Sequence, residues 1–580
     1  MRRDKTTFEN GMGVENFSLL YPRTLGETSK EENLFLELSP AAAHDLGLDE
    51  IIMAFTTDRG HQREIRDLFF RLPRDPEVIS YRQAVLEDLL ANPALAARLA
   101  SLLPVMDSLY HASYRSEREM TWLHEVVWRA GELLNIIDCF EGLGDVLASA
   151  EGGIHSDGLR HLQDEIRRVR SEALYQRLVR ELPGLLARLQ GKASLTIGVN
   201  LDGSLRPIQA VLLSVNEKPF TDQSLLNRLF GTRTDREGIA PLHSVPQGYV
   251  GGVYTGPVDP LMVPLFADLA SVLEKTAIPI ADQLRQYAGL HGGLFTNLRQ
   301  GLAFYLGAIR LIRRFEGQGL SMCRPQIVPA GERRFEVKDS YNVNLVLKQL
   351  DAGDGKPPAV VPNDIHIGPV GHILILTGPN RGGKTTYIQG TGLVQILAQA
   401  GCYVPGTQAV ISPLDHLFTH FPLEERPESD AGRFGEEAIR LGEIFQQVTQ
   451  YSLVLLNESL SSTSFSESLY LAQDLVRILR RVGARAIYST HLHELANRVD
   501  ELNNSVPGES RVISIVSSPI EPEGGGDGLS RTYKLEVRPP LGQSYAREIA
   551  ARYGISYQQL ENVLSERGVL QERRGEEKKG

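Results

Sequence analysis

The chain contains 580 residues, 42% of them apolar, and carries a formal net charge of -11 at pH 7. Its length is about four times that of one typical domain, which predicts several structural units. The acidic balance excludes a surface that is basic throughout, so contact with nucleic acid would need a local basic patch.

Three cysteines without paired spacing argue against a disulfide framework or a cysteine metal cluster, and they indicate a reducing compartment. We recognise no signal peptide and no apolar run long enough to span a bilayer. We therefore expect a soluble, cytoplasmic protein with no membrane partner.

The N-terminal half of the chain is predicted to be mainly helical. Residues 1–34 are polar and are expected to form a flexible segment. Residues 35–151 place apolar side chains at three- and four-residue spacing, which predicts a helical core domain that ends at Gly152 and Gly153. Residues 152–330 are predicted to form lever helices with a small β-hairpin.

Two patterns support this lever region. Helical spacing covers residues 158–189, where Pro183 and the following glycine are expected to bend the end of the helix. Beyond it, Ser194–Asn200 and Leu205–Ser214 flank an Asp-Gly pair, which predicts a β-hairpin. The hairpin is either a clamp element or a packing device.

Residues 331–565 are predicted to form an α/β ATPase domain, followed by a charged tail over 566–580. Here an apolar strand runs into a G-x-x-x-x-G-K-T loop and then into a helix. Small residues let backbone N–H groups converge on phosphate oxygens, and the helix dipole faces the same anion. The candidate cofactor-binding residues are Gly378, Pro379, Asn380, Arg381, Gly382, Gly383, Lys384, Thr385 and Thr386.

The loop predicts a bound nucleoside triphosphate with Mg²⁺. Lys384 would reach the β- and γ-phosphates as a point charge, which makes it a catalytic candidate, and the Thr385 hydroxyl would ligate Mg²⁺. A glycine turn without a ligand is the alternative, but it explains neither side chain.

A second strand carries polar residues at its end. Asn457 stands where such ATPases usually have the aspartate that holds Mg²⁺ through water, and Glu458 follows as the candidate that activates the attacking water. We expect weaker magnesium affinity and slow hydrolysis, because one negative charge is missing. A strand end with polar caps is the alternative.

A third strand, Ala486–Thr490, delivers His491 to the carboxyl edge of the same expected sheet, where open α/β sheets bind ligands. A lone histidine is more often structural. Its position after a strand beside a phosphate loop favours a catalytic role as a γ-phosphate sensor.

These motifs closely resemble the ATPase domain of the MutS family of DNA mismatch repair proteins. The loop at Gly378–Thr386, the segment Leu453–Ser464 and the run Thr490–Leu495 keep the family's order and spacing. The stretch Val361–Asp364 and the closing residues Gly542–Ala546 are also similar. The resemblance implies a multidomain α plus α/β protein, with a helical core and lever region followed by a P-loop (ABC-type) α/β ATPase domain.

The chain also departs from this family. Residues 1–40 are too few for the domain that reads mismatches, and Ser459–Ser462 replaces a glycine-rich turn. In the family, a serine-bearing loop completes the partner subunit's site, and the nearest candidates here are Ser429, Gly432 and Arg433. The resemblance implies a MutS-like ATPase without the mismatch-reading module.

The leading function implied by the resemblance is a nucleotide-gated homodimeric clamp on structured or mismatched DNA, acting in mismatch repair or recombination-type processes. The candidate basic patches are Arg167, Arg168 and Arg170, and Arg310, Arg313 and Arg314. One alternative is a ribosome- or RNA-associated quality-control ATPase, since one MutS branch has such members. Another, motivated by Asn457, is a catalytically weak nucleotide-gated scaffold.

Overall fold

The computed structural model describes residues 17–22, 34–113, 122–190, 194–204, 207–216, 221–222, 237–238, 284, 287, 292–353, 356–368, 373–379, 381–422, 432–517, 521–522, 529–530, 532–540, 554–567 and 569. Contacts divide the chain into two compact units. Unit 1 contains Met1–Leu19 and Asp88–Leu302, and unit 2 contains Leu20–Glu87 and Ala303–Gly580. This division groups residues 35–87 with the C-terminal part, whereas the sequence-based boundaries group them with residues 88–151. Those boundaries stay a prediction.

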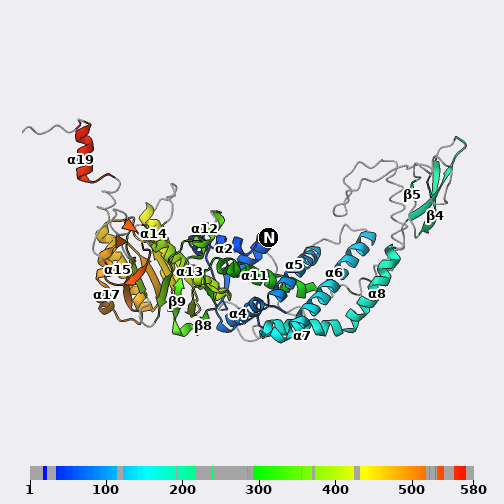
Figure 1. Ribbon diagram of the computed structural model, residues 1–580, viewed down its shortest axis with the longest axis horizontal. Helices are drawn as coiled ribbons and strands as arrows, with labels where there is room; N and C mark the ends of the chain where they lie inside the picture. Colours follow the sequence, from blue (N-terminus) through cyan, green and yellow to red (C-terminus); the bar gives the residue numbers. More distant parts are fainter. Residues whose placement is uncertain are drawn as a thin grey trace, which may run out of the picture. The chain divides into compact units, whose positions relative to one another are not determined.

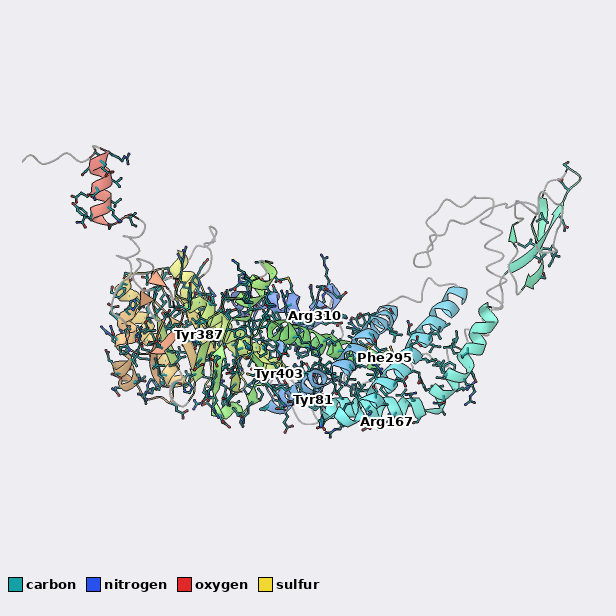
Figure 2. All side chains as sticks on the ribbon, in the orientation of Figure 1. Tyr81, Arg167, Phe295, Arg310, Tyr387 and Tyr403 are labelled. Atoms are coloured by element: carbon teal, nitrogen blue, oxygen red, sulfur yellow. The ribbon has the colours of Figure 1, made fainter. Side chains whose placement is uncertain are left out.

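Unit 1 is built from helices that pack in chain order. They are α5 (Pro93–Ser113), α6 (Trp122–Ser149), α7 (Asp157–Ser171) and α8 (Ala173–Gln190), with the first part of α11 (Gly292–Glu316) (Figure 1). In the core, the Phe295 ring meets the Phe140 ring edge-on at a centroid distance of 4.8 Å (Figure 2). Arg299 of α11 is 3% exposed at its side chain and donates to Asp107 of α5 at 2.9 Å.

The helical stretch predicted over residues 158–189 is two helices, with the break at Glu172 instead of at Pro183. Glu172 is extended, at φ -66° and ψ 135°, and Pro183 lies inside α8. The break coincides with a change in the spacing of the buried residues. Buried residues recur every three or four positions up to Val169, but the next one is Tyr175, six residues on.

The β-hairpin of unit 1 confirms the sequence prediction. β3 (Ser194–Leu201) pairs antiparallel with β4 (Pro207–Asn216). At the turn, the Ser204 amide donates to Asp202 Oδ1 at 2.8 Å, the local bond that favours aspartate in turns. Its assignment as a clamp stays a prediction.

Unit 2 contains a six-stranded sheet in the order β14-β15-β16-β11-β17-β20. The strands are β14 (Leu417–His420), β15 (Leu453–Asn457), β16 (Arg485–Ser489), β11 (Ile373–Thr377), β17 (Val512–Ser517) and β20 (Leu535–Val537). The first five are parallel and β20 is antiparallel. Every residue of β11, β15 and β16 is buried, as expected for parallel strands covered on both faces.

Helices cover the two faces of this sheet. One apolar core joins alternate residues of the strands to α14 (Gly432–Gln447), α15 (Phe465–Val482), α16 (His493–Asn497) and α17 (Val499–Ser505). On the other face, α13 (Lys384–Ala400) approaches so closely that a Cβ at Gly392 would lie 3.0 Å from Leu455. A helical unit and an α/β unit therefore confirm the coarse fold class.

A second sheet of unit 2 has the order β10-β9-β13-β8. Its strands are β10 (Asn363–Ile367), β9 (Phe335–Ser340), β13 (Gln408–Ile411) and β8 (Gln326–Ile327). The remaining short strands are β1 (Phe35–Glu37), β2 (Arg71–Pro73), β5 (Thr221–Asp222), β6 (Glu237–Gly238), β7 (Met322–Cys323), β12 (Val404–Pro405), β18 (Glu521–Pro522) and β19 (Leu529–Ser530). The remaining helices are α1 (Pro40–Leu46), α2 (Leu48–Phe55), α3 (Arg59–Phe70), α4 (Pro76–Ala91), α12 (Val343–Asp351), α19 (Tyr557–Glu566) and two 3-10 turns, Glu151–Gly153 and Ala330–Glu332.

The N-terminal segment of unit 2 is bound to the C-terminal segment by buried polar contacts. Arg82 is fully buried and donates to the carbonyl oxygens of Leu20 at 2.9 Å and Ala400 at 3.2 Å. Asn344 donates to the carbonyl of Gly47 at 2.9 Å. The Arg82–Ala400 and Asn344–Gly47 bonds join the two segments, so neither segment satisfies these groups alone.

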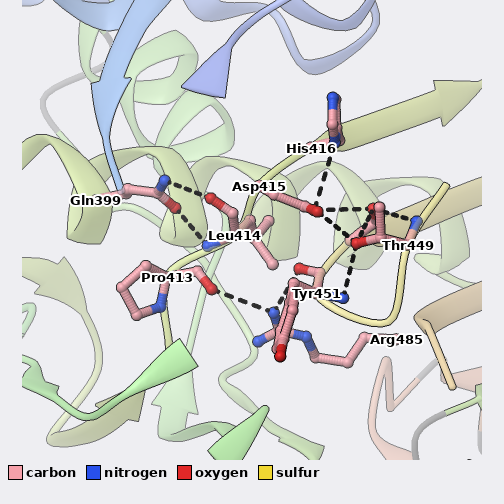
Figure 3. A network of polar contacts seen from close by, with 9 residues as sticks. Gln399, Pro413, Leu414, Asp415, His416, Thr449, Tyr451 and Arg485 are labelled. Atoms are coloured by element: carbon pink, nitrogen blue, oxygen red, sulfur yellow. Dashed lines mark hydrogen bonds and ion pairs between the residues drawn. The ribbon is translucent and has the colours of Figure 1, made fainter. Parts of the chain in front are cut away.

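A polar network lies at the amino-terminal ends of β14, β15 and β16 (Figure 3). The Asp415 carboxylate accepts hydrogen bonds from Thr449 and from Ser452, the latter at 2.9 Å. Beside it, fully buried Arg485 donates to the Tyr451 carbonyl at 2.8 Å. These bonds fix the loops at the amino-terminal edge of the sheet. The glycine-rich loop and Glu458 lie at the opposite edge, where β11 and β15 end.

Within the described parts of the chain, no single helix is long and apolar enough to cross a membrane. One bent pair, Pro76–Ala91 with Pro93–Tyr110, meets the length and composition criteria only jointly.

Candidate functional site

The glycine-rich loop leaves the sheet at the carboxyl end of β11 and enters α13. Gly378 has φ 142° and Gly383 has φ 87°, backbone conformations that favour glycine. Ser517 at the end of β17 packs against the loop, because a Cβ on Gly378 would lie 2.7 Å from the Ser517 Cβ. The Ser517 hydroxyl also donates to the Gly382 carbonyl at 2.8 Å. Packing and backbone conformation therefore both require small residues here.

Lys384 is the first residue of α13, and its side chain folds back over the loop. The residue is 5% exposed, and its Nζ donates to the carbonyl oxygens of Gly378 at 3.0 Å and Pro379 at 3.1 Å. Burial lowers the pKa of Lys384, and the negative charge of Glu458 acts in the opposite direction. The ammonium group therefore lies against the backbone of the loop. A bound anion there would offset the free-energy cost of burying its charge.

Thr385 and Asn457 meet across the sheet edge. The Thr385 hydroxyl donates to Asn457 Oδ1 at 3.3 Å, and Asn457 is the last residue of β15. Both are oxygen donors of the kind that Mg²⁺ prefers. Among the described residues, no group of three or more histidine, cysteine, aspartate or glutamate side chains is placed to hold a metal. A magnesium ion here would therefore need water and phosphate oxygens to complete its shell.

Glu458 and His491 form a pair at the ends of β15 and β16. His491 Nε2 lies 2.9 Å from Glu458 Oε1, and the Glu458 amide donates to the Ser489 carbonyl at 2.9 Å. The hydrogen bond with His491 lowers the pKa of Glu458 against the opposing effect of burial, and the charges of His491 and Lys384 lower it further. The carboxylate is therefore held ionised at neutral pH.

The loop residues and Glu458 open onto one cleft of about 440 Å³, and Asn457 and His491 are not among its lining residues. Its lining residues include Asn342, Leu345, Gln349, Val361, Asn363, Arg381, Gly382, Gly383, Lys384, Thr385, Thr386, Tyr387, Glu458 and Tyr533. The structure thus brings the loop and Glu458 together in one cavity. Their chemical roles stay predictions.

Sequence reasoning missed Tyr533 and Asn363 as lining residues, although Asn363 lies in the stretch Val361–Asp364 named above. Asn363 Nδ2 donates to the Tyr533 carbonyl at 3.0 Å, and its Oδ1 accepts from the Leu535 amide at 2.8 Å. The aromatic ring at Tyr533 stands near the loop, since a Cβ on Gly383 would lie 3.4 Å from it. The only available signal was the resemblance, because 170 residues separate the two partners.

Two predicted residues, Asn380 and Ser429, lie outside the described part of the chain. Gly432 and Arg433 begin α14, where Arg433 Nε lies 3.8 Å from Glu437 Oε1. Their contribution to a partner's site stays a prediction.

Five of the arginines proposed as basic patches have intramolecular partners: Arg167, Arg168, Arg170, Arg310 and Arg314. Arg168 donates to Glu165 at 2.6 Å and to Glu172 at 2.8 Å, and Arg170 donates to Glu141. Arg310 donates to the Phe55 carbonyl at 2.7 Å, and Arg314 pairs with Asp351. Nearby carboxylates reduce the positive potential of these surfaces.

Comparison with known proteins gives two family matches. Residues 374–517 match MutS domain V, and residues 74–318 match the MutS2 N-terminal domain. The first match contains β11, α13, Asn457, Glu458 and His491.

Individual relatives cover different shares of the chain. A DNA mismatch repair protein MutS of Synechococcus sp. is 27% identical over 82% of this chain and 54% of its own length. One from Bacillus pumilus is 30% identical over 46% of this chain and 31% of its own, and one from Chlorobium limicola is 36% identical over 32% and 20%. The chain thus spans between about a fifth and about half of the length of these relatives.

The two family matches cover the helical part and the α/β part of the chain. The match to the α/β part contains the loop, the Asn457–Glu458 strand end and His491, the motifs on which the resemblance was based. Both the helical part and the α/β part of the chain are therefore similar to the MutS family.

Proposed function

We propose that this protein binds ATP with Mg²⁺ in the cleft beside Lys384, hydrolyses it slowly, and acts as a nucleotide-gated dimeric clamp on DNA. One observation carries the proposal: Lys384, Thr385 and the Glu458–His491 pair converge at the carboxyl edge of one parallel sheet. This is the edge at which open α/β sheets bind ligands.

The loop residues supply binding. Backbone amides of Gly382 and Gly383 and the N-terminus of α13 attract phosphate oxygens. Lys384, which donates to two loop carbonyls, would exchange those bonds for phosphate contacts. Thr385 and Asn457 would hold magnesium, which neutralises phosphate charge when bound.

Hydrolysis requires a water molecule aimed at the γ-phosphorus. Glu458 would orient this water and accept its proton while the bond to the ADP oxygen breaks. His491 lies 2.9 Å from Glu458, and in this proposal it would hold the carboxylate in position and sense the terminal phosphate. Asn457 leaves one negative charge fewer beside the ion, which favours slow turnover.

The proposal of dimerisation and DNA binding is based on the similarity to MutS proteins. The relatives are named for DNA mismatch repair. The side chains of Glu458 and His491 are 34% and 44% exposed, which leaves the phosphate end of the cleft open to a second subunit. The ribosome- or RNA-associated alternative finds no support among these relatives.

The test is nucleotide binding by the purified chain, with and without magnesium. The wild type should bind and hydrolyse ATP, Lys384→Ala should lose both, and Lys348→Ala, which removes an exposed lysine on α12, should lose neither. Undetectable binding by the wild type would refute the proposal. Binding without hydrolysis would favour the scaffold alternative.

A second experiment addresses the partners. Sedimentation with a non-hydrolysable ATP analogue should show dimers, and retention on mismatched or four-way junction DNA should depend on ATP. Cosedimentation with ribosomes in place of DNA retention would favour the alternative class.

A further inference from the structure

Glu458 lies in an unusual stretch of backbone. Its φ is 51° and that of Leu460 is 65°, so two residues with side chains adopt left-handed conformations on either side of Ser459. Such conformations persist only where the surroundings hold them in place. The contacts of Ser459 therefore decide where the Glu458 carboxylate points.

Ser459 is 5% exposed and is held at both its side chain and its main chain. Its Oγ shares a hydrogen bond with His420 Nδ1 at 2.7 Å. Its carbonyl accepts a hydrogen bond from the Tyr488 hydroxyl at 3.0 Å. Next to it, Ser468 of α15 donates to the Leu460 carbonyl at 2.6 Å.

The two partners of Ser459 come from the strands on either side of β15. His420 is the last residue of β14, and Tyr488 lies in β16, one residue before its end. His420 and Tyr488 are 1% and 0% exposed. The residue that follows Glu458 is thus anchored to both neighbouring strands, while the Glu458 amide is bound to Ser489.

The imidazole of His420 stays neutral at physiological pH. Burial lowers its pKa to about 4, and the positive charge of Arg440 acts in the same direction. At the pH values used in ATPase assays, the neutral ring and the serine hydroxyl are joined by one hydrogen bond. The contact therefore behaves as a constant anchor.

We propose that His420, Ser459 and Tyr488 form a positioning network that holds the Glu458 carboxylate toward the reacting phosphate. The network rests on the proposed ATPase function and does not itself touch nucleotide. Removing a contact should rotate the left-handed turn and misplace the carboxylate, which reduces the rate of the chemical step and leaves nucleotide binding intact.

The first test compares Ser459→Ala and Tyr488→Phe with the wild type in ATP turnover and in ATP affinity. Each variant should lower kcat about tenfold while the Kd for ATP stays within about twofold. Ser510→Ala is the matched control, because Ser510 is equally buried and donates to the Ala484 carbonyl at the opposite end of β16. It should lower the Tm by a similar amount without changing kcat.

The second test uses His420. His420→Leu should reduce kcat as Ser459→Ala does, and the double variant should be no slower than Ser459→Ala, because Ser459→Ala already removes both hydrogen bonds between the serine hydroxyl and His420. His420→Asn, which keeps an amide donor near the Nδ1 position, should recover part of the rate. A Ser459→Ala variant that turns over ATP at the wild-type rate, while Glu458→Gln is slow, would overturn the network alone. A wild type that hydrolyses no ATP would overturn the proposed function and the network with it.

Discussion

His491 Nε2 lies 2.9 Å from Glu458 Oε1 and joins the ends of two adjacent parallel strands, β15 and β16. If this carboxylate activates water, Glu458→Gln should lower kcat by about 100-fold or more, within the usual range for a general base. ATP affinity should change little, because the amide keeps the shape of the side chain. Single-turnover hydrolysis with equilibrium binding checks both, and an unchanged rate would exclude the role.

The pair also predicts a pH effect. The hydrogen bond with His491 lowers the pKa of Glu458. A depressed carboxyl pKa keeps the group ionised as the pH falls, and activity is lost only when the pH passes through the folded pKa. In His491→Ala, the acidic limb of kcat should therefore move to higher pH. Rates measured between pH 4 and 7 test this, and an unmoved limb contradicts it.

Asn457→Asp should strengthen magnesium binding. One more negative charge about 4 Å from a divalent ion is worth roughly 2 to 8 kcal/mol before desolvation is subtracted, so the net gain will be smaller. ATP turnover should reach half of its maximum at a lower magnesium concentration in the variant. Asn504→Asp, at an exposed position of α17 remote from the loop, provides a charge-matched control. Equal magnesium dependence in the Asn457 variant and the wild type would rule out a role for this residue in holding the ion.

Gly378→Ala should destabilise unit 2 and prevent phosphate binding. The new Cβ would meet the Ser517 Cβ at 2.7 Å, and φ is 142°, a conformation that alanine rarely adopts. We expect a loss of about 1–3 kcal/mol in unfolding free energy from strain of this kind. Gly442→Ala, where a Cβ has no neighbour within 4 Å, should be neutral or stabilising. Urea unfolding of both variants gives the comparison.

The Asp415 network predicts acid sensitivity of the fold. Burial would raise the pKa of this carboxyl, but hydrogen bonds with His416, Thr449 and Ser452 outweigh it and lower the pKa to about 2 (Figure 3). The network therefore stabilises the fold fully above the unfolded pKa near 3.8, and this stabilisation is lost as the pH falls toward 2. The difference corresponds to about 2 kcal/mol. Thr449→Val should raise the pH of acid unfolding, monitored by circular dichroism.

Local pattern was enough to predict the strands and helices around the loop. β11, β15 and β16 are short apolar runs ending in polar residues, and β16 lies within one residue of its expected bounds. The hairpin was also predictable, because an Asp-Gly pair between two alternating runs has few other interpretations. The order of the sheet was not, since it depends on pairing between strands far apart in sequence.

Two features escaped prediction for different reasons. The break at Glu172 was not evident from the sequence, because the apolar Leu174 lies between the buried Val169 and Tyr175 and is itself exposed in the structure. The partnership of His420 with Ser459 was not visible, because it joins residues 39 positions apart through strand pairing. Contacts of this kind become apparent only when the sheet order is known.

The burial of Arg82 against Leu20 and Ala400 bears on how the polypeptide reaches its native state. During synthesis, the segment Leu20–Glu87 leaves the ribosome first. All of Asp88–Leu302 must follow before Ala303–Gly580, the other part of unit 2, is made. During that interval its apolar helices lack their final neighbours, a situation that promotes aggregation and chaperone binding. A fragment that starts at Ala303 should therefore be poorly soluble when expressed alone, and adding residues 20–87 as a separate chain should restore its solubility.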